Sequence, residues 1–475
     1  MQYSIINYSN LEKNSIRFDP EYYHPQNLKL LKRLKSMPNQ AIGEFSYVTD
    51  GIHESIQFDE NSKINLISAK APKENFFDLS GCGKISVSQD KKNPRTRLNK
   101  DDIIVSTVGT IGNCAVVDEI ILPANSDRHV GIIRINKDFY PRFLSSFLLS
   151  KYGRFQTLRE STGNVQLNLF IYKIKEIITP SLSEKFQLLV ENTCLKANDL
   201  NKYANNLYSK AEQILLSELD LLNWKPKRQL SFVKNYSDTQ SALRIDAEYF
   251  QPMYKDIINC SKAKVETFLI DEVFTFKRGD FIDTKYYTNE RTKRAYIRIK
   301  ELSNLSSINE AQVIYIDDGF LDGSQNTLKE FDIVTAIIGD TIGKSNLILK
   351  EYDGSYFSNN TGRFRLRTDF KSKFDPFYLE TLFHSIYIQS QIQRAKAQTG
   401  QPKIADSEIK KILIPCIDLG KQKRISQNIQ KALDSNKISK QLLDIAKRGV
   451  EMAIEKDEKQ AHNWINSELK NLNIK

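Results

Sequence analysis

The sequence has no long apolar run and no clustered cysteines, and each absence removes a class of protein. No stretch approaches the roughly 18 apolar residues of a membrane-spanning helix, and residues 1–10 lack the basic start and apolar centre of a secretion signal. The five cysteines are scattered singly, without the spacing of a zinc site or the density of a disulfide framework. We therefore expect a cytoplasmic protein without a membrane partner, whose cysteines are reduced and structural.

Motifs of catalysis and nucleotide binding are also missing. The loops Gly109–Gly112 and Gly339–Gly343 lack the Gly-Lys-Ser/Thr ending of a nucleotide loop, so a turn between two strands is the better interpretation. The Asp-x-Glu pairs at 19–21 and 246–248 are alternate residues, which point to opposite faces of an extended segment. That favours a structural or subunit-docking role over acid–base or metal chemistry. The five histidines form no ligand-spaced pair, and there is no nucleophile elbow.

The length and the charge of the chain indicate how many domains it has and what kind of partner it binds. A chain of 475 residues is too long for one core and suits two globular domains. With 40% hydrophobic and 27% charged residues, it has the composition of a folded, soluble protein. The net charge of +11 and the pI near 9.1 indicate an anionic partner, and without membrane signals that partner is nucleic acid.

The chain is a tandem repeat. Arg17-Phe-Asp-Pro-Glu-Tyr-Tyr-His-Pro matches Arg244-Ile-Asp-Ala-Glu-Tyr-Phe-Gln-Pro. Residues 102–112 match 332–343 with one residue inserted, and the turn after Thr162 matches the turn after Thr399. Three collinear matches are hard to obtain by chance. Between these landmarks, residues 50–100 and 280–330 share little sequence, which would suit two halves that read different targets.

Each half ends in a long helix with apolar or small residues at a four-three spacing, the mark of a helix packed along one partner helix. We predict that the two pack antiparallel. Short β-rich runs precede each helix, so the predicted fold is α+β with two tandem β-rich domains and a pseudo-two-fold repeat. In the first half, a further helix is expected to run from Phe143 to the turn at Gly163. The two seams are Phe186, Val190, Thr193, Ala197, Leu200, Ala204, Leu207, Ala211 and Ile214, and Ile425, Ile429, Ala432, Asn436, Ser439, Leu443, Ala446, Val450 and Ala453.

Basic clusters lie in both halves, at residues 84–100 and 277–300, and we expect them at similar places in the two domains. On loops, such side chains can meet phosphates, and arginine can pair with guanine; a solvated basic surface is the plain alternative. The turns after Gly163 and Gly400 carry amide and basic groups suited to the same task, or serve only as turns. The predicted DNA-binding residues are Lys91, Lys92, Arg95, Arg97, Arg128, Asn164, Gln166, Arg291, Lys293, Arg294, Arg363, Gln401 and Lys403. No catalytic, metal-binding or cofactor-binding residue is predicted.

The most specific run of the sequence is Gly400-Gln-Pro-Lys-Ile, followed by Ile412, Ile414 and Pro415, and then by Gln422-Lys-Arg-Ile. It matches the turn, short strand and helix start of the specificity subunits of type I restriction-modification enzymes, a family that the whole sequence resembles. Lys421 stands where the family usually has glutamate; the first half keeps Glu184 but has Lys185-Phe186 in place of Gln-Lys.

The resemblance implies two target recognition domains that each read one half of a bipartite site in double-stranded DNA. We expect these domains at residues 1–180 and 223–415, with spacer helices at 181–222 and 416–475. The helices would dock two methyltransferase subunits, which bind S-adenosylmethionine, and restriction subunits would cut unmodified DNA. This chain itself would be no enzyme and bind no cofactor. The alternative is a freestanding sequence-specific DNA-binding protein, or a specificity protein for another methyltransferase.

Overall fold

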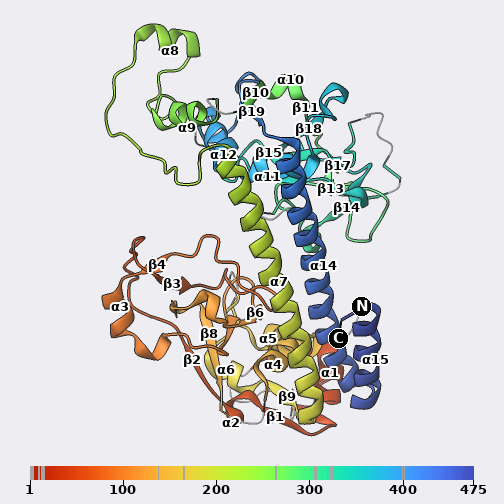
Figure 1. Cartoon of the computed structure of the whole chain (residues 1–475). Coiled ribbons are helices and arrows are strands. Elements are labelled where there is room, and N and C mark those ends of the chain that lie inside the picture. Colours follow the sequence, from red (N-terminus) through yellow and green to blue (C-terminus); the bar gives the residue numbers. More distant parts are fainter. Residues whose placement is uncertain are drawn as a thin grey trace. The chain divides into compact units, whose positions relative to one another are not determined.

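The chain folds into two compact units, residues 1–201 with 437–475 and residues 202–436. The computed structural model describes residues 5–8, 11, 17–136, 139–163, 166–262, 265–303, 307–317, 319–320, 326–397, 400 and 402–474. Two long helices, α7 (Glu184–Glu218) and α14 (Leu419–Glu455), each contribute one half to each unit (Figure 1). Both units contain sheets and helices, as the predicted α+β class requires.

The first unit is built in layers around an antiparallel sheet of order β2-β8-β5-β6. Ile103 and Val105 pack against helices α4 and α5, whereas Ile104 packs against the smaller sheet β4-β3-β7 on the other face. This alternation follows from the two-residue period of a strand. The elements are α1 (Pro25–Lys35), β1 (Asn39–Ala41), α2 (Ile42–Phe45), β2 (Ser46–Asp50), β3 (Ile64–Ile67), β4 (Lys84–Ile85), α3 (Val87–Lys92), β5 (Ile103–Ser106), β6 (Cys114–Val116), β7 (Ala124–Ser126), β8 (Val130–Ile135), α4 (Pro141–Leu149), α5 (Lys151–Glu160), α6 (Ile171–Glu176) and β9 (Ile178–Pro180).

The second unit repeats this arrangement. Its central sheet has the order β11-β18-β15-β16; Ile333 packs toward helices α11 and α12, and Val334 packs toward the sheet β12-β14-β13-β17. The elements are α8 (Tyr236–Ala242), α9 (Met253–Lys262), β10 (Glu266–Leu269), α10 (Ile270–Val273), β11 (Phe274–Arg278), β12 (Tyr287–Thr288), β13 (Ala295–Ile297), β14 (Ile314–Ile316), β15 (Ile333–Ala336), β16 (Ser345–Leu347), β17 (Tyr356–Phe357), β18 (Thr361–Leu366), α11 (Pro376–His384), α12 (Ile386–Ala395), α13 (Asp406–Ile409) and β19 (Leu413–Cys416). The predicted pseudo-two-fold repeat is thus a repeat of strand order.

The long helices run antiparallel within each unit, as the seams predict. In the first unit, Ser439 Oγ donates a hydrogen bond to the carbonyl oxygen of Ala197 at 2.7 Å. In the second unit, Lys421 Nζ lies 2.8 Å from Glu218 Oε1, and Ala204 shares a buried cluster with Ala432. Small residues at these positions let the two backbones approach closely. Most of the seam is buried, although Leu442 rather than Leu443 is the fully buried leucine of α14.

Two helices that we predicted to be continuous are interrupted. The helix expected to run from Phe143 to the turn at Gly163 is two helices, because Ser150 leaves helical geometry (φ −67°, ψ 165°) and its side chain caps α5. Likewise, the expected single C-terminal helix ends at Glu455. Asp457 then caps a separate helix, α15 (Glu458–Asn471), which runs beside the C-terminal half of α14 (Figure 1).

Candidate nucleic-acid interface

One end of the central sheet of the first unit carries a set of adjoining surface loops. Because neighbouring strands are antiparallel, the loops that leave β2 and β5 lie beside those that enter β8 and β6. Backbone pairing joins them: Ile52 bridges to Asp127, Thr107 N–H donates to the His129 carbonyl at 3.1 Å, and Leu169 N–H donates to the Thr107 carbonyl at 2.9 Å. We call this the first sheet-end surface; it comprises residues 51–53, 107–113, 127–129, 162–163 and 166–169.

The second unit forms the same surface with the same bonds. Asp280 bridges to Ser358, Ile337 N–H donates to the Asn360 carbonyl at 3.1 Å, and Ile404 N–H donates to the Ile337 carbonyl at 3.1 Å. The second sheet-end surface comprises residues 279–281, 337–344, 358–360 and 402–404. The chain therefore presents one backbone frame twice, with different side chains on it.

Glycine turns form the centre of both surfaces. Gly109 (φ 75°) and Gly339 (φ 91°) adopt left-handed backbone conformations that favour glycine, and the strands on either side pair as hairpins. The strand-to-strand interpretation of these loops is thus confirmed. The turns predicted after Gly163 and Gly400 pack directly on them, since Val108 bridges to Asn168 and Gly339 N–H donates to the Pro402 carbonyl at 2.9 Å.

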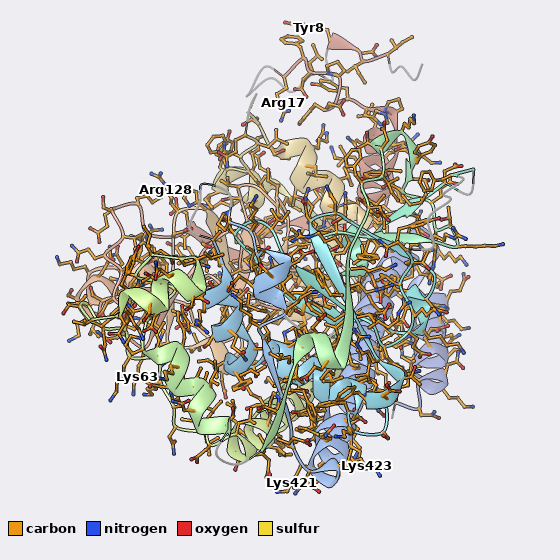
Figure 2. The ribbon with its side chains drawn as sticks, turned by 90° about the horizontal axis from the view of Figure 1, so that it is seen from above. Tyr8, Arg17, Lys63, Arg128, Lys421 and Lys423 are labelled. Atoms are coloured by element: carbon orange, nitrogen blue, oxygen red, sulfur yellow. The ribbon has the colours of Figure 1, made fainter. Side chains whose placement is uncertain are left out.

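Three of the predicted DNA-binding residues lie at these surfaces, and a fourth borders the first of them. Arg128, Gln166 and Lys403 are exposed, and Figure 2 shows Arg128 at the outer edge of the ribbon. Arg95 reaches the first surface from outside it, where its Nη1 lies 3.0 Å from Asp50 Oδ1. Two further candidates, Asn164 and Gln401, lie outside the described residues.

The contacts of Asp50 hold Arg95 in place. His53 Nε2 lies 2.5 Å from the other carboxylate oxygen of Asp50. Burial of Asp50 raises its pKa, but hydrogen bonds from His53 and Arg95 outweigh burial, so that the pKa lies below its usual value. The carboxylate therefore stays charged and orients the guanidinium of Arg95 at the edge of the surface.

The rest of the first basic cluster is divided between structural and exposed side chains. Arg97 Nη2 lies 2.6 Å from Asp90 Oδ2, and this hydrogen bond raises the pKa of the arginine. The guanidinium is thus engaged in holding α3. Lys91 and Lys92 are exposed in the last turn of α3 and form no ion pair within the described part of the chain. They are available to an anion.

The second basic cluster occupies a different place from the first, so the expectation of similar places is wrong. Arg291, Lys293 and Arg294 precede β13, at the strand end opposite the sheet-end surface. Arg291 and Lys293 are exposed, whereas Arg294 donates to the Tyr356 hydroxyl and lies 5.3 Å from the centroid of its ring.

Arg363 is not a DNA-contacting residue in this structure. It is only 3% exposed, in the middle of β18. Its Nη1 donates to the Thr327 carbonyl at 3.3 Å. Burial and the neighbouring charge of Arg365 lower its pKa. A buried guanidinium cannot reach a phosphate, which corrects the prediction made from its place in a basic strand.

The sequence alone did not single out one lysine pair, Lys70 and Lys300. Asp127 N–H donates to the Ile67 carbonyl at 3.1 Å, and Ser358 N–H donates to the Ile297 carbonyl at 2.9 Å, so Ile67 and Ile297 are equivalent. The exposed lysines three residues later are then equivalent too. Lys70 directly follows Ala69, whose carbonyl accepts a hydrogen bond from Ser106 Oγ. Only the strand pairing reveals this match, because the surrounding sequences differ.

Other chemistry finds little support in the described residues. They contain no group of three His, Cys, Asp or Glu side chains that could hold a metal ion, and none of their helices is long and apolar enough to span a membrane. Burial raises the pKa of Cys114 to about 11 and that of Cys194 to about 12, so both thiols stay protonated at neutral pH.

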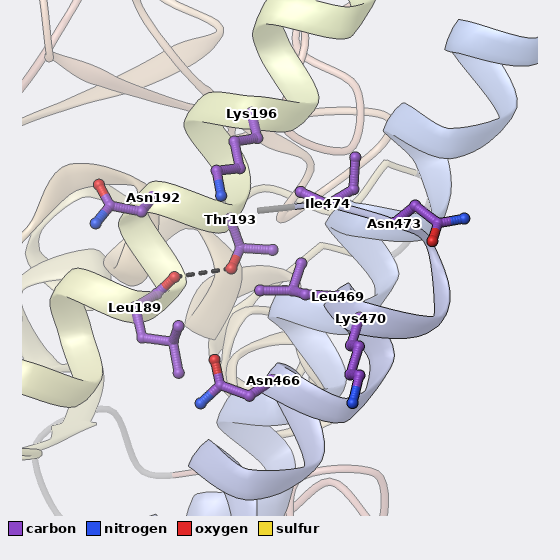
Figure 3. A pocket seen from close by; sticks show the side chains of 9 residues that line it. All are labelled: Leu189, Asn192, Thr193, Lys196, Asn466, Leu469, Lys470, Asn473 and Ile474. Atoms are coloured by element: carbon purple, nitrogen blue, oxygen red, sulfur yellow. Dashed lines mark hydrogen bonds between the residues drawn. The ribbon is translucent and has the colours of Figure 1, made fainter.

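A groove of about 490 Å³ lies between α7 and α15 in the first unit (Figure 3). Amide, ammonium and aliphatic groups line it, and Thr193 Oγ1 is occupied by a hydrogen bond to the Leu189 carbonyl at 2.8 Å. It has no carboxylate, histidine or cysteine, so it offers no acid–base or nucleophilic pair. Its lining is Leu189, Asn192, Thr193, Lys196, Asn466, Leu469, Lys470, Asn473 and Ile474.

The chain is similar to several known proteins. The chain is 28% identical over 163 residues to the specificity subunit of the type I restriction enzyme EcoBI from Escherichia coli, a match that covers 33% of this chain and spans about a third (34%) of that relative. The S subunit of the type I restriction-modification system from M. genitalium has a TM-score of 0.36 at 15% identity, covering 90% of this chain and 95% of that one. The HsdS subunit from Thermoanaerobacter tengcongensis has a TM-score of 0.28 at 14% identity, covering 88% and 96%.

The family model matches twice, once in each half. The model of the type I restriction modification DNA specificity domain matches residues 42–190 and 262–448, more than two thirds of the chain. Both matches contain a complete sheet-end surface and the start of a long helix. The chain therefore belongs to the family of type I restriction-modification DNA specificity domains.

Proposed function

We propose that this chain is the DNA sequence-recognition subunit of a type I restriction-modification complex, and that each half reads one half of a bipartite site. The observation that carries the proposal is the duplicated sheet-end surface, with one backbone frame and two sets of side chains. A family of DNA specificity domains and a net charge of +11 both fit a DNA partner. We assign the recognition domains to residues 1–180 and 223–415, and the spacer helices to 181–222 and 416–475.

Among the predicted residues, Arg128, Gln166 and Lys403 fit direct DNA contact best, together with Lys70 and Lys300. Arg95, Lys91 and Lys92 can add phosphate contacts beside the first surface. Arg291 and Lys293 precede β13, at the end away from the second sheet-end surface. They would contact the DNA only if the DNA extends that far. We leave Arg97 and Arg294 as supporting residues because their guanidinium groups are occupied by Asp90 and Tyr356.

Catalysis belongs to partners under this proposal. Two methyltransferase subunits would dock on the helices, bind S-adenosylmethionine and methylate adenine, and restriction subunits would cut unmodified DNA in the cytoplasm. The purified chain, given S-adenosylmethionine and DNA, should transfer no methyl group, and the complex with methyltransferase subunits should methylate a bipartite site. Methyl transfer by the chain alone would overturn the assignment. A chain that recognises DNA as a solitary dimer, with no bound methyltransferase, would favour the freestanding DNA-binding alternative.

A further inference from the structure

Residues 228–245 of the second unit expose apolar side chains over their whole length. Leu230, Val233, Tyr236, Leu243 and Ile245 are each at least 75% exposed. Single exposed apolar residues are ordinary, but a concentration of them marks an interaction site. Helix α8 lies in this segment, buries no residue and stands on a long loop beside α9 (Figure 1).

The same segment begins the first half. Residues 2–9 read Gln-Tyr-Ser-Ile-Ile-Asn-Tyr-Ser, and residues 229–237 read Gln-Leu-Ser-Phe-Val-Lys-Asn-Tyr-Ser, with Lys234 as the only insertion. Where the structure describes the first copy, Ile5 is 87% and Tyr8 is 81% exposed. An apolar pattern that is present twice and exposed twice is not explained by the core of either unit.

A clamp of side chains lies where the first copy joins its unit. Arg17 forms an ion pair with Asp19 at 2.8 Å and donates to the carbonyl of Arg159 at 2.9 Å. The ring of Tyr22 lies between the two guanidinium groups, 4.6 Å from that of Arg17 and 3.5 Å from that of Arg159. This network accounts for the repeated Arg-x-Asp motif as a structural anchor.

The second copy has the same clamp. Arg244 pairs with Asp246 at 2.7 Å and donates to the carbonyl of Ala395 at 3.2 Å. The ring of Tyr249 lies 4.4 Å from Arg244 and 4.4 Å from Arg394. Each segment therefore leaves its unit at the same place, the end of α5 or α12. A partner that touches both the segment and this anchor would meet the same surface once in each half.

The backbone of the second copy is also unpaired. Residues 230–234 make no hydrogen bond with any described residue of the chain. Leu230 and Phe232 are alternate residues, so both would face one side of an added strand, with Ser231 facing the other. An extended peptide with free backbone groups and alternating apolar side chains is suited to strand addition.

We propose that the two leader segments, residues 2–9 and 229–237, are docking peptides that each add a strand to an apolar-lined sheet edge on one copy of the same partner protein. The choice of partner rests on the proposed function: it is the adenine methyltransferase subunit, and two copies of it bind to each chain. Duplication of sequence, anchor and exposure favours one protein partner in two copies over a membrane surface, which would require no repeated anchor.

The test counts methyltransferase subunits bound per full-length chain by native mass spectrometry. The variants are Tyr3→Asp with Ile5→Asp, Leu230→Asp with Phe232→Asp, and all four together, because these pairs are the alternate apolar residues of the two copies. Losing two buried apolar side chains should weaken binding of the affected copy at least about 100-fold. Each double variant should therefore hold one subunit, and the quadruple variant none. Ser231→Asp with Ser237→Asp adds the same charge in the same segment without removing apolar surface, and should still hold two.

The outcomes separate this inference from the function on which it rests. If the wild-type chain binds DNA but no methyltransferase, the proposed function fails and the inference with it. If the wild type and the quadruple variant both hold two subunits, only the inference fails. It is equally overturned if the segments mediate self-association, seen as a wild-type dimer that the quadruple variant lacks, or if they bind anionic vesicles while two subunits stay attached. DNA binding and the melting temperature of all variants should match those of the wild type, since the described side chains among them belong to no hydrophobic core cluster.

Discussion

The two units share a sheet but differ in what fills the space around their helices. In each, a glutamine near the start of a long helix fixes the equivalence: Gln187 accepts from Tyr140 N–H at 3.2 Å, and Gln422 accepts from Asp375 N–H at 2.9 Å. From these points, positions along the two halves can be compared one by one. The backbone bonds are repeated, and so are some polar side-chain contacts, such as the ion pairs Arg134–Asp102 and Arg365–Asp332, while others differ.

The surroundings of the long helices show the difference. In the first unit, Glu74 lies 3.6 Å from both Arg154 and Lys447. The second unit has Gln389 at the position of Arg154 and Glu212 at the position of Lys447. Both residues line a cavity of about 740 Å³. The comparison teaches that main-chain bonding preserves the frame, while side chains are free to diverge. Two domains that read different half-sites require that freedom.

The largest expected effect concerns a buried ion pair present in one half only. Arg142 Nη1 lies 2.9 Å from Glu191 Oε1, with both side chains at most 8% exposed, and the equivalent residues of the second unit are Phe377 and Ser426. Glu191→Ala should lower the free energy of unfolding by about 3 kcal/mol. It removes the carboxylate that pairs with the buried Arg142 guanidinium and accepts the Arg142 N–H, and it leaves only the half-exposed Asp101, 3.2 Å away, as a charged partner. Urea denaturation measures this. Ser426→Ala serves as the matched control and should cost under about 1 kcal/mol.

Replacing both residues of the ion pair should restore the stability lost in Glu191→Ala. Arg142→Phe with Glu191→Ser installs the second unit's residues and should recover most of the loss, since no charge remains buried. A loss below about 1 kcal/mol for Glu191→Ala alone would show that water already solvates the pair.

A second prediction concerns α15, which packs beside α14 in the first unit. An added Cβ at Gly449 would lie 2.4 Å from Ile465 Cδ1, whereas the equivalent residue of α7 is Ile214. Gly449→Ile should therefore cost about 1–3 kcal/mol by overpacking and expose residues 456–474 to proteases. Gly420→Ala, which would approach only the carboxylate of Asp418, is the control. Equal protease resistance of Gly449→Ile and wild type would show that α15 docks without this contact.

The third prediction is a pH dependence confined to the second unit. Burial lowers the pKa of His384, but the hydrogen bond to buried Glu380 at 3.0 Å outweighs burial and raises it, with a further contribution from Glu212. Because the folded pKa is raised, this stabilisation is present below about pH 6.5 and is lost as the pH rises through the folded pKa. The melting temperature of the second unit should fall over that range.

The first unit supplies the matched replacement, because Ser145 and Leu149 occupy the equivalent positions. Glu380→Ser with His384→Leu should remove this part of the pH dependence. If the wild type and this variant lose stability in parallel between pH 5.5 and 8.5, the pair does not titrate as described.

The smallest expected effect concerns the equivalent lysines Lys70 and Lys300, which lie outside the two sheet-end surfaces as defined. Lys70→Ala and Lys300→Ala should each weaken DNA binding and reduce the slope of log affinity against log salt by about one unit, as expected for one lost phosphate contact. Arg97→Ala should change the slope less, because its guanidinium is occupied by Asp90. Fluorescence anisotropy over a salt series measures all three. Equal slopes for wild type and both lysine variants would remove the lysines from the interface.

The sequence predicted what depends on local periodicity. The seam positions Phe186, Ala197 and Ala446 are buried as expected, because a four-three spacing places them on one helix face. The breaks at Ser150 and Ser385 were not predicted, since no glycine or proline marks either one.

The candidate site depended on contacts between distant residues, which periodicity does not show. Arg363 lies in a strand with other arginines, which is typical of a strand at the surface. It is nevertheless buried, because the second sheet covers the face of β18 on which it lies. Lys70 and Lys300 became comparable only through the bonds of Ile67 and Ile297. The DNA contacts themselves stay predictions.

Exchange of one recognition domain tests the central claim most directly. Ile42 N–H donates to the Ile177 carbonyl at 2.9 Å, and Ile270 N–H donates to the Ile412 carbonyl at 2.8 Å, so these bonds mark equivalent junctions. A chain in which residues 42–177 also replace residues 270–412 would carry the first sheet-end surface twice. Methylated adenines would be mapped in DNA from cells that contain this chain and its methyltransferase. We predict two inverted copies of the first half-site; methylation at the original asymmetric site would contradict the account.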